Sequence, residues 1–532
     1  MSTARVIRPT SVNPRAAAYR ASGALPDRFL WQPLESAAAE HPDRIAVVDD
    51  GIELSFGEYW SRVRSVAAAL LELGVSPGTC VVYQLPNRWE ALVVHFAIAY
   101  AGAIGVPMVG THREHELGFV IGQLRPSLAV ATGGLVAPMA DALAAAGHDC
   151  PLIVARPEPG EPGLDLAGLL GGAPAAAPAG APSDVATIIY TSGSTGSPKG
   201  VLHSHETLLA DAGTRIPDFA LTEDDVIFMP SSLAHIAGLS YGAHLPALLG
   251  CRTVLMARWS PEGAVDLVES SGATVMNGAP LMLRSMTEVY ESRASGSSLR
   301  VFACGGADVS ERMVLDARRV LDAFVTRAYG CSEIPTLCWG KPSDDPARTA
   351  ATDGRPIGAV ELRVVAEDGT VLGTDEIGEC VAIGPERGVG YVDASLNDAL
   401  YTADGWVRTG DLVSVDAEGY LTVHGRKKDI IVRAGENISA REIELLLLAH
   451  DAVVEAAVVP SPDPVVGERT HAVVLLRPGT GLTLDEVKEW MAAQGVAKIK
   501  WPELLTVLDE FPRSAFGKID KPRLRSILAE AS

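Results

Sequence analysis

Short, β-rich apolar runs alternate with segments of helical length through roughly the first 330 residues, and no other feature restricts the fold as strongly. The runs lie at 80–85, 102–108, 128–132, 186–191, 226–230 and 253–257. Strands followed regularly by helices are typical of parallel sheets covered on both faces. The sequence therefore predicts an α/β fold with layered mixed sheets.

The pattern changes near residue 425. Strand-and-turn signals at 360–373 and 419–425 predict a β-rich subdomain, and mixed helix and strand signals follow. We expect a large N-terminal domain over residues 1–425, a small α+β domain over 426–532, and a hinge at Gly425–Lys428. The Pro/Ala/Gly-rich stretch 157–184 predicts a surface connection.

Charge and cysteine usage restrict the partners and the compartment. Lys and Arg number 44 against 66 Asp and Glu, so the net charge is −22. Such a chain offers no broad surface for nucleic acid or anionic lipid. Seven scattered cysteines without C-x-x-C spacing, and an N-terminus without an apolar signal, predict a reducing, cytoplasmic setting.

One stretch has the length of a membrane span. Ala91–Gly110 contains no formal charge. Its internal glycine, proline and histidine instead favour a buried helix that turns at Gly102 into a strand ending at Pro107. We therefore expect no membrane partner.

The strongest local motif is Tyr190–Gly200, a loop of glycines and hydroxyls ending at Lys199. Glycines let backbone N–H groups approach an oxyanion, hydroxyls add donors, and a lysine adds a point charge, as a polyphosphate requires. The loop is not a Walker A motif, because Gly200 rather than Ser or Thr follows Lys199. Ser204 could cap the next helix.

Further motifs follow in a fixed order. They are Tyr329–Glu333, Arg408–Asp411, Gly425–Asp429, Arg433–Asn437 and Pro512–Lys518. With the glycine-rich loop they resemble the signature of the adenylate-forming superfamily, which includes acyl- and aryl-CoA synthetases. The resemblance covers about residues 30–528 and implies a mobile C-terminal domain.

The resemblance implies that a small-molecule carboxylate attacks the α-phosphorus of ATP, with release of pyrophosphate and formation of an acyl-adenylate. Glu333 would ligate Mg²⁺, and Ser332 would reach the α-phosphate. The expected phosphate-binding residues are Thr191, Ser192, Gly193, Ser194, Thr195, Gly196 and Lys199. The expected adenine-binding residues are Gly305, Gly306, Ala307, Ala328, Tyr329, Gly330 and, in the same motif, Cys331. Asp411 would accept from the ribose hydroxyls, with Arg426 nearby.

Two residues are candidates for catalysis. By resemblance, Lys518 would meet both the carboxylate and the α-phosphate, whereas a lysine near a C-terminus is otherwise usually a surface residue. His235 follows a buried strand, where a histidine is commonly a core residue. The resemblance places it at the mouth of the acyl site, shaping the carboxylate end.

A second half-reaction with coenzyme A is implied by the family's domain rotation. Lys428 matches the hinge position, and Gly435, Glu436 and Asn437 would line the thiol channel. Many relatives have a lysine where this chain has Ala434, which puts a lysine-specific role there in doubt. Arg258 matches a position that can meet coenzyme A phosphates.

The acid is expected to be compact and hydrophobic, whether medium-chain, alicyclic or aromatic. Residues 228–242 contain no Asp or Glu to pair with an amino acid's ammonium, which disfavours amino-acid activation. The expected pocket residues are Ile236, Ala237, Tyr241, Cys304, Gly305, Cys331, Pro335 and Thr336. The segment 82–126 looks most similar to cyclohexanecarboxylate-type and short-chain acyl-CoA ligases.

Other acceptors remain open at this point. The ATP-handling motifs are shared with enzymes that use an amine, a carrier protein or nitrite, the last as in the related diazotases. The chain's end shortly after Lys518 favours a free-standing ligase. A non-catalytic nucleotide-binding protein is disfavoured because Glu333 and Lys518 are both present. The oligomeric state is open, a homodimer included.

Overall fold

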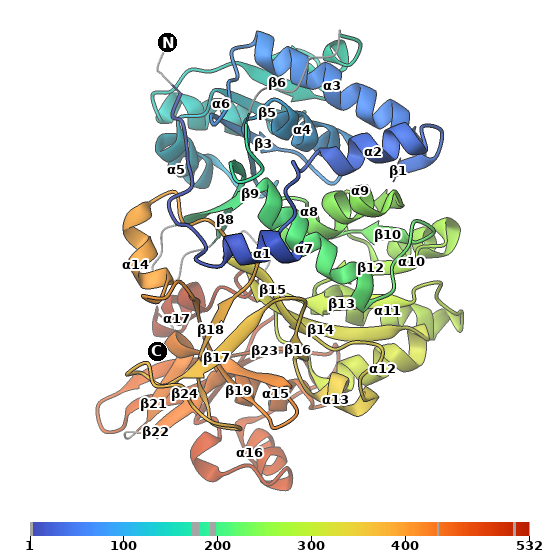
Figure 1. Ribbon diagram of the computed structural model, residues 1–532. Helices are drawn as coiled ribbons and strands as arrows, with labels where there is room; N and C mark the ends of the chain where they lie inside the picture. The colour runs from blue at the N-terminus through green and yellow to red at the C-terminus, as the bar shows by residue number, and fades with distance from the viewer. Residues whose placement is uncertain (1–3, 173–179, 192–197, 434–435, 514–517, 531–532) are drawn as a thin grey trace.

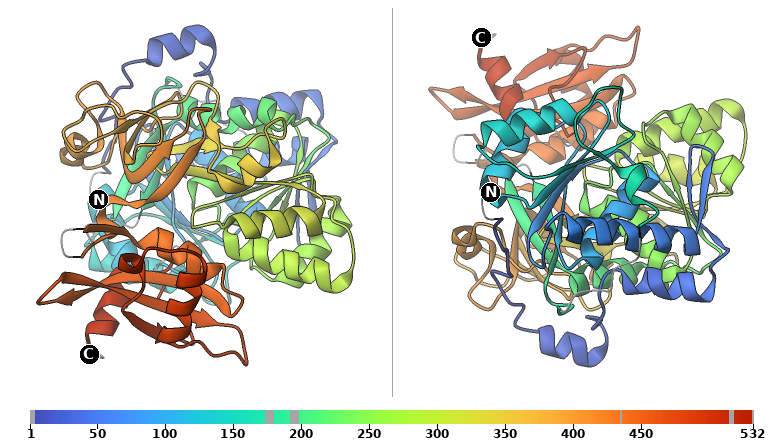
Figure 2. Two further views of the ribbon diagram at one scale, coloured as in Figure 1. Left: turned by 90° about the horizontal axis from the view of Figure 1, so that it is seen from below. Right: turned by 90° about the horizontal axis from the view of Figure 1, so that it is seen from above.

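The computed structural model describes residues 4–172, 180–191, 198–433, 436–513 and 518–530, and within them nothing is described of the Asn437 side chain. Figure 1 shows a first large sheet at the top, a second below it, and a small lobe drawn in orange to red at the bottom. Figure 2 shows the red small lobe as a separate body beside the large domain in two further views.

The first sheet has seven strands in the order β7-β6-β5-β3-β4-β8-β9 and is parallel except for the β8–β9 hairpin. Its strands are β3 (Cys80–Gln84), β4 (Ile104–Pro107), β5 (Leu128–Thr132), β6 (Leu152–Ala155), β7 (Leu164–Asp165), β8 (Val185–Thr191) and β9 (Lys199–Ser204). One face packs on α3 (Phe56–Glu72) and α4 (Trp89–Tyr100), the other on α5 (Glu114–Leu124) and α6 (Val136–Ala145). Alternate strand residues enter the two cores, as the period of two requires.

The second sheet has nine strands in the order β16-β15-β14-β13-β12-β10-β11-β1-β2. Its strands are β1 (Ile45–Asp49), β2 (Ile52–Ser55), β10 (Val226–Met229), β11 (Arg252–Leu255), β12 (Val275–Gly278), β13 (Val301–Gly305), β14 (Phe324–Cys331), β15 (Ile334–Trp339) and β16 (Arg355–Pro356). One face is covered by α10 (Pro261–Ser271), α11 (Pro280–Arg293) and α12 (Glu311–Leu321). In the core that the two sheets share lie α7 (His205–Asp218), α8 (Ile236–Leu239), the π-helical turn η2 (Ser240–His244) and α9 (Leu245–Leu249).

An antiparallel subdomain precedes the small lobe. Its strands are β17 (Glu361–Val365), β18 (Gly378–Ile383), β19 (Val407–Val415) and β20 (Leu421–Arg426). The small lobe contains β21 (Ile430–Arg433), β22 (Glu436–Ser439), β23 (Val453–Asp463), β24 (Gly467–Leu476), β25 (Leu504–Val507), α15 (Ala440–Leu448), α16 (Leu484–Ala493) and α17 (Lys521–Glu530). It has a hydrophobic core of its own. The predicted fold class is therefore confirmed.

Shorter elements complete the described chain. They are α1 (Ala16–Ser22), α2 (Gln32–Glu40), α13 (Pro346–Ala351), α14 (Asn397–Leu400) and the 3-10 turns η1 (Leu166–Leu169), η3 (Ala394–Leu396), η4 (Lys427–Asp429) and η5 (Lys498–Lys500).

The apolar stretch 91–110 forms the predicted buried helix and strand, α4 and β4. Every residue of α4 is buried, because the helix packs against α3, β4 of the first sheet and β1 of the second sheet. Among the described residues, no helix is both long enough and apolar enough to cross a membrane. Ser204 caps α7, as predicted, by accepting from the Thr207 amide at 3.3 Å.

The stretch 157–184 is more than the predicted surface connection. Leu164 and Asp165 extend the first sheet by pairing in parallel with β6, and Leu166 is fully buried in the main core. Leu166 and the partly buried Leu169 and Leu170 supply the apolar area that packs near α3, which the Pro/Ala/Gly-rich composition did not indicate.

Candidate active site

The predicted adenine-binding segments lie side by side. β13 and β14 are parallel neighbours, with Gly305 opposite Ala328. A Cβ on Gly305 would lie 2.5 Å from the Ala328 carbonyl oxygen, and one on Gly330 would lie 2.1 Å from the Pro335 oxygen. Only glycine fits at both positions, and it leaves Gly306 and Ala307 exposed beside Tyr329.

Tyr329, Asp411 and Arg426 also come together. The Tyr329 hydroxyl donates to Asp411 Oδ2 at 3.0 Å, and Arg426 Nε lies 3.5 Å from Asp411 Oδ1. Asp411 and Arg426 face each other across β19 and β20. Burial raises the pKa of Asp411, against the opposing effect of the Arg426 guanidinium. A buried carboxylate with an arginine beside it is suited to accept hydrogen bonds from two neighbouring hydroxyls. The assignment of Asp411 to the ribose stays a prediction.

Glu333 stands where β14 turns into β15. The Tyr391 hydroxyl donates to Glu333 Oε1 at 2.5 Å, and the Gly388 amide donates to the Glu333 carbonyl at 2.8 Å. The Lys199 Nζ lies 5.5 Å from the centroid of the Tyr391 ring. Tyr391 was not among the residues predicted from the sequence. The only available signal was the preceding Gly388-Val389-Gly390, a pattern that favours a loop.

Glu333 is suited to a magnesium ion. Mg²⁺ prefers oxygen ligands and is commonly held by one or two carboxylates together with substrate phosphates. Within the described ranges, no group of three or more His, Cys, Asp or Glu residues is arranged to hold a metal. A single carboxylate completed by ATP phosphates therefore fits this chain better than an all-protein metal cage.

The phosphate loop is described only at its ends. Thr191 and Lys199 are paired across the β8–β9 hairpin, so the loop between them starts and ends at one point. Ser192, Gly193, Ser194, Thr195 and Gly196 lie outside the described residues, as does Gly435 of the second glycine loop. The backbone of Asn437 lies in β22.

Lys518 of the small lobe interacts with groups of the large domain. Although water reaches this lysine, the surrounding protein lowers the pKa of its ammonium, first by desolvation and then through the Arg426 guanidinium. Asp411 and Asp308 act in the opposite direction. Burial followed by the Lys518 charge lowers the pKa of His235 to about 4. The Lys518 charge is therefore near enough to act on His235, which is neutral near pH 7.

Contacts between the lobes accompany this arrangement. Arg441 on α15 forms an ion pair with Asp308 at 2.6 Å, directly after the predicted adenine-binding segment. Arg284 donates to the Val454 carbonyl, and Arg312 lies 3.0 Å from Asp451. The small lobe is thereby held with Lys518 toward the large domain. Lys428, at the predicted hinge, is exposed in η4.

The predicted acid-binding residues come from three elements. His235 precedes α8, Ile236 and Tyr241 are buried in and after that helix, and Ala237 is half-buried. Cys304 is buried on β13. Cys331 and Pro335 are half-buried and Thr336 is buried on the β14–β15 hairpin, where Ser332, the residue predicted to reach the α-phosphate, is also half-buried.

The expected small and apolar pocket has a polar neighbour that the sequence reading missed. Arg215 of α7 lies 4.4 Å from the Tyr241 ring centroid and donates to Thr336 Oγ1 at 2.9 Å. Asp211, one turn earlier, accepts from the same hydroxyl at 2.8 Å. The sequence signal for this ion pair was an Asp and an Arg four residues apart in a predicted helix, a spacing that brings the two side chains together.

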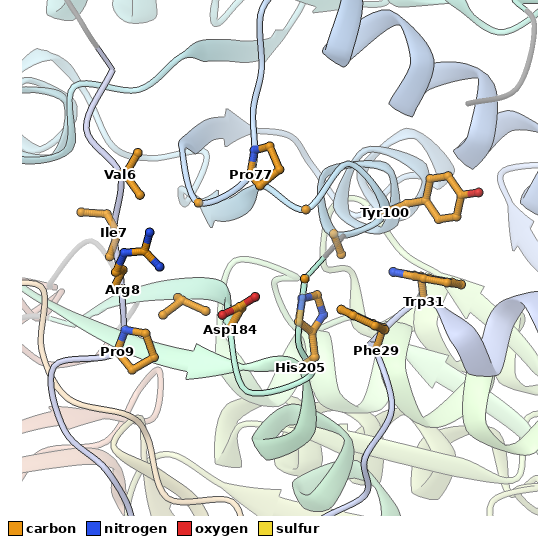
Figure 3. A pocket seen from close by; sticks show the side chains of 15 residues that line it. Val6, Ile7, Arg8, Pro9, Phe29, Trp31, Pro77, Tyr100, Asp184 and His205 are labelled. Atoms are coloured by element: carbon orange, nitrogen blue, oxygen red, sulfur yellow. The ribbon is translucent and has the colours of Figure 1, made fainter. Parts of the chain in front are cut away.

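Arg258 shares its cavity with no other predicted site residue that the structure describes. It is exposed after β11 and lines a cavity of about 590 Å³ with Arg88 and Arg156. A second cavity, of about 240 Å³, lies between the N-terminal segment and the end of α4, and Figure 3 shows Phe29, Trp31 and His205 on its wall. None of the predicted site residues that the structure describes lines the second cavity.

This fold and site define the class of protein. The family model of the AMP-binding enzyme matches residues 34–392, and the AMP-binding enzyme C-terminal domain matches residues 442–518. The chain belongs to the AMP-binding, adenylate-forming superfamily, whose members activate carboxylic acids with ATP. Neither match reaches residues 425–428, so the hinge position and the domain boundary stay predictions.

Individual relatives differ in the acceptor they serve. The chain is 33% identical over 525 residues to the medium-chain fatty-acid–CoA ligase of Escherichia coli strain K12, covering 96% of this chain and 92% of that protein. It is 34% identical over 532 residues to the salicyl-AMP ligase / salicyl-S-ArCP synthetase of Mycobacterium tuberculosis, covering 95% and 92%. The ATP-bound structure of MatB from Rhodopseudomonas palustris superimposes with a TM-score of 0.86 at 26% identity, covering 95% and 99%.

Proposed function

We propose that this adenylate-forming enzyme converts a compact, largely apolar carboxylic acid into its acyl-adenylate and then transfers the acyl group to coenzyme A. The observation that carries the first step is the electrostatic interaction of Lys518 with Asp411 and His235 across the two lobes. This interaction supports a role for the Lys518 ammonium where nucleotide and acid would meet.

The first step brings a carboxylate to a polyphosphate, so like charges must be stabilised in a fixed geometry. Lys199 and the loop before it would hold the β- and γ-phosphates, and Asp411 the ribose. Glu333 would bind Mg²⁺, which supplies charge neutralisation at the phosphate oxygens. Lys518 would stabilise the charge that develops as the carboxylate oxygen bonds to the α-phosphorus and pyrophosphate leaves.

For the second step we propose domains over residues 1–425 and 426–532, rotating about Gly425–Lys428. Rotation would separate Arg441 from Asp308 and withdraw Lys518. Gly435, Glu436 and Asn437 would then face the adenylate. The cavity beside Arg258 contains three arginines that could meet coenzyme A phosphates, although Arg88 and Arg156 are already paired with Asp49 and Glu90.

Coenzyme A as the acceptor is supported by relatives. Besides the Escherichia coli ligase, the chain is 33% identical to a propanoyl:CoA ligase of Mycobacterium tuberculosis that acts on a bicyclic acid, over 93% of this chain and 98% of that protein. That relative also supports a compact alicyclic acid, in line with the resemblance to cyclohexanecarboxylate-type ligases.

Loading of a carrier protein is the second candidate. The salicyl-S-ArCP synthetase supports it at similar identity, and Ala434 stands where many coenzyme A ligases have a lysine. Both candidates share the adenylation step and differ only in the thiol that accepts the acyl group.

The decisive experiment measures pyrophosphate release with a panel of alicyclic, aromatic and straight-chain acids, with and without coenzyme A, and identifies the product by mass spectrometry. The proposal expects acid-dependent release that coenzyme A accelerates, with an acyl-CoA product. An adenylate that accumulates unchanged with coenzyme A, but is consumed by a phosphopantetheinylated carrier protein, would favour the second candidate. Absence of acid-dependent exchange of labelled pyrophosphate into ATP would refute the adenylation step itself.

A further inference from the structure

A buried ion pair lies on α7, outside the set of residues assigned above to the reaction. Arg215 Nη1 lies 3.1 Å from Asp211 Oδ2, and the two side chains are 2% and 1% exposed. Arg215 also donates to the Asp211 main-chain carbonyl. The pair therefore spans one helical turn within the core.

Both members of the pair contact the predicted acid-binding residues. Thr336 Oγ1 lies 2.8 Å from Asp211 Oδ1 and 2.9 Å from Arg215 Nη2, and the Ser240 hydroxyl donates to Asp211. The guanidinium lies 4.4 Å from the ring centroid of Tyr241 and 5.6 Å from that of Trp339. We call these six residues the polar floor: Asp211, Arg215, Ser240, Tyr241, Thr336 and Trp339.

The polar floor joins three elements that adjoin the proposed site. α7 follows directly after β9, whose His203 Nε2 lies 2.7 Å from the Ser332 carbonyl oxygen. The helical segment with Ser240 and Tyr241 begins after His235, and β15 with Thr336 begins after Glu333. An acid with its carboxylate at His235 and Lys518 would extend its body between the last two elements, toward Tyr241 and Thr336.

A hydrocarbon chain cannot displace this floor cheaply. Separating a buried ion pair leaves an uncompensated charge, which typically costs about 3–5 kcal/mol. Each hydroxyl that lost its partner would add to this cost. The same residues replaced by apolar side chains of similar volume would be tolerated, because both charges disappear together.

We propose that the polar floor limits the length of the acid, so that the enzyme accepts short-chain, alicyclic or single-ring aromatic acids and rejects long straight-chain acids. This inference rests on the proposed adenylation of a carboxylic acid. On this view the similarity to the medium-chain fatty-acid–CoA ligase does not extend to the length of the substrate.

The test compares wild-type enzyme with the double variant Asp211→Leu/Arg215→Met. Acid-dependent exchange of pyrophosphate into ATP is measured with straight-chain acids from butanoate to dodecanoate and with cyclohexanecarboxylate and benzoate. Wild-type enzyme should turn over the compact acids and lose activity as the chain lengthens. The double variant should gain roughly tenfold or more in kcat/KM for the longer acids relative to the compact ones, because a hydrocarbon chain can displace apolar side chains without separating a buried ion pair.

A matched control is Arg20→Met. It removes the ion pair with Glu206 in the first turn of α7, in which Arg20 Nε donates to Glu206 Oε2 at 2.9 Å, and should leave the length profile unchanged. Thermal unfolding of all variants separates a changed profile from a misfolded protein. If the double variant does not fold, the milder Thr336→Val keeps the ion pair but removes one hydroxyl bonded to it. This variant should still raise activity with the longer acids, relative to the compact acids, by several fold.

Efficient use of dodecanoate by the wild-type enzyme would overturn the proposal, and so would an unchanged length profile in a folded double variant. Absence of exchange activity with every acid tested would instead refute the proposed function. The two failures are distinguishable because only the second abolishes activity with the compact acids.

Discussion

The hydroxyl of Tyr391 donates a 2.5 Å hydrogen bond to Glu333, and the ring of the same tyrosine lies 5.5 Å from the Lys199 ammonium. Tyr391 is 4% exposed and therefore has little freedom to turn. One side chain thus contacts both the proposed magnesium ligand and the proposed phosphate-binding lysine. The N-terminal segment fixes it further, because Thr10 Oγ1 donates to the Tyr391 carbonyl at 2.8 Å.

Tyr391→Phe should weaken the use of magnesium and ATP. A hydrogen bond to a charged group contributes about 1.5–3 kcal/mol, so we expect roughly a tenfold or larger rise in the magnesium concentration needed for half-maximal exchange. Calorimetry of ATP binding with and without Mg²⁺ provides a readout independent of turnover. Tyr59→Phe is the matched control, since the Tyr59 hydroxyl is buried without a partner among the described residues. An equal loss at all magnesium concentrations would argue against this role for Tyr391.

Lys518→Ala should act on the first half-reaction alone. Loss of a preorganised charge at the reacting centre is expected to slow adenylate formation by roughly 10²–10³. Conversion of a preformed adenylate should be nearly unaffected, because the proposed rotation withdraws this residue. Single-turnover measurements of each step separate the two effects, with Lys488→Ala on α16 as a control in the same lobe. Equal losses in both steps would contradict the rotation.

Arg441→Ala should shift the balance between the two lobe orientations. The ion pair with Asp308 is only partly exposed, whereas the pair between Arg312 and Asp451 lies in solvent. Exposed pairs contribute little, about 0–1 kcal/mol. We therefore expect several-fold slower adenylate formation in Arg441→Ala and no measurable change in Arg312→Ala. The opposite ranking of these variants would count against Arg441 as the contact that holds the adenylating orientation.

Acid should destabilise the folded protein through buried histidines. Burial lowers the pKa values of His95 and His205 to about 3 from 6.5. Between these values the unfolded chain binds more protons than the folded one, so stability is present above pH 6.5 and is lost as the pH falls toward 3. At pH 5 each such histidine should cost about 2 kcal/mol.

The variant His95→Gln tests this estimate while retaining hydrogen-bonding capacity toward Tyr83 and His244, which both lie 3.0 Å from the His95 ring nitrogens. Urea unfolding at pH 7.5 and pH 5 should show a smaller loss of stability in the variant by about 2 kcal/mol. The comparison with wild type is needed because Glu386, whose pKa burial raises to about 8, contributes with the opposite sign. Identical losses in both proteins would show that His95 does not titrate on unfolding.

The local structure followed from the sequence wherever neighbouring residues decide it. The helix and strand within 91–110 and the cap at Ser204 depend on hydrophobic period, glycine and side-chain hydrogen bonds over a few residues. The order of the motifs likewise identified the superfamily and the chemistry of acid activation before any contact was known.

Only the tertiary structure decided which distant residues meet. Tyr391 reaches Glu333 across 58 positions, and Thr336 reaches Asp211 across 125. Leu166 is buried because β7, directly before it, pairs with β6 at the sheet edge. The composition of the stretch 157–184 had instead predicted a surface connection. Such contacts depend on how sheets stack and how lobes dock. The type of a residue and its neighbours in the chain do not determine such long-range contacts, because a tyrosine or an arginine is also common on a protein surface.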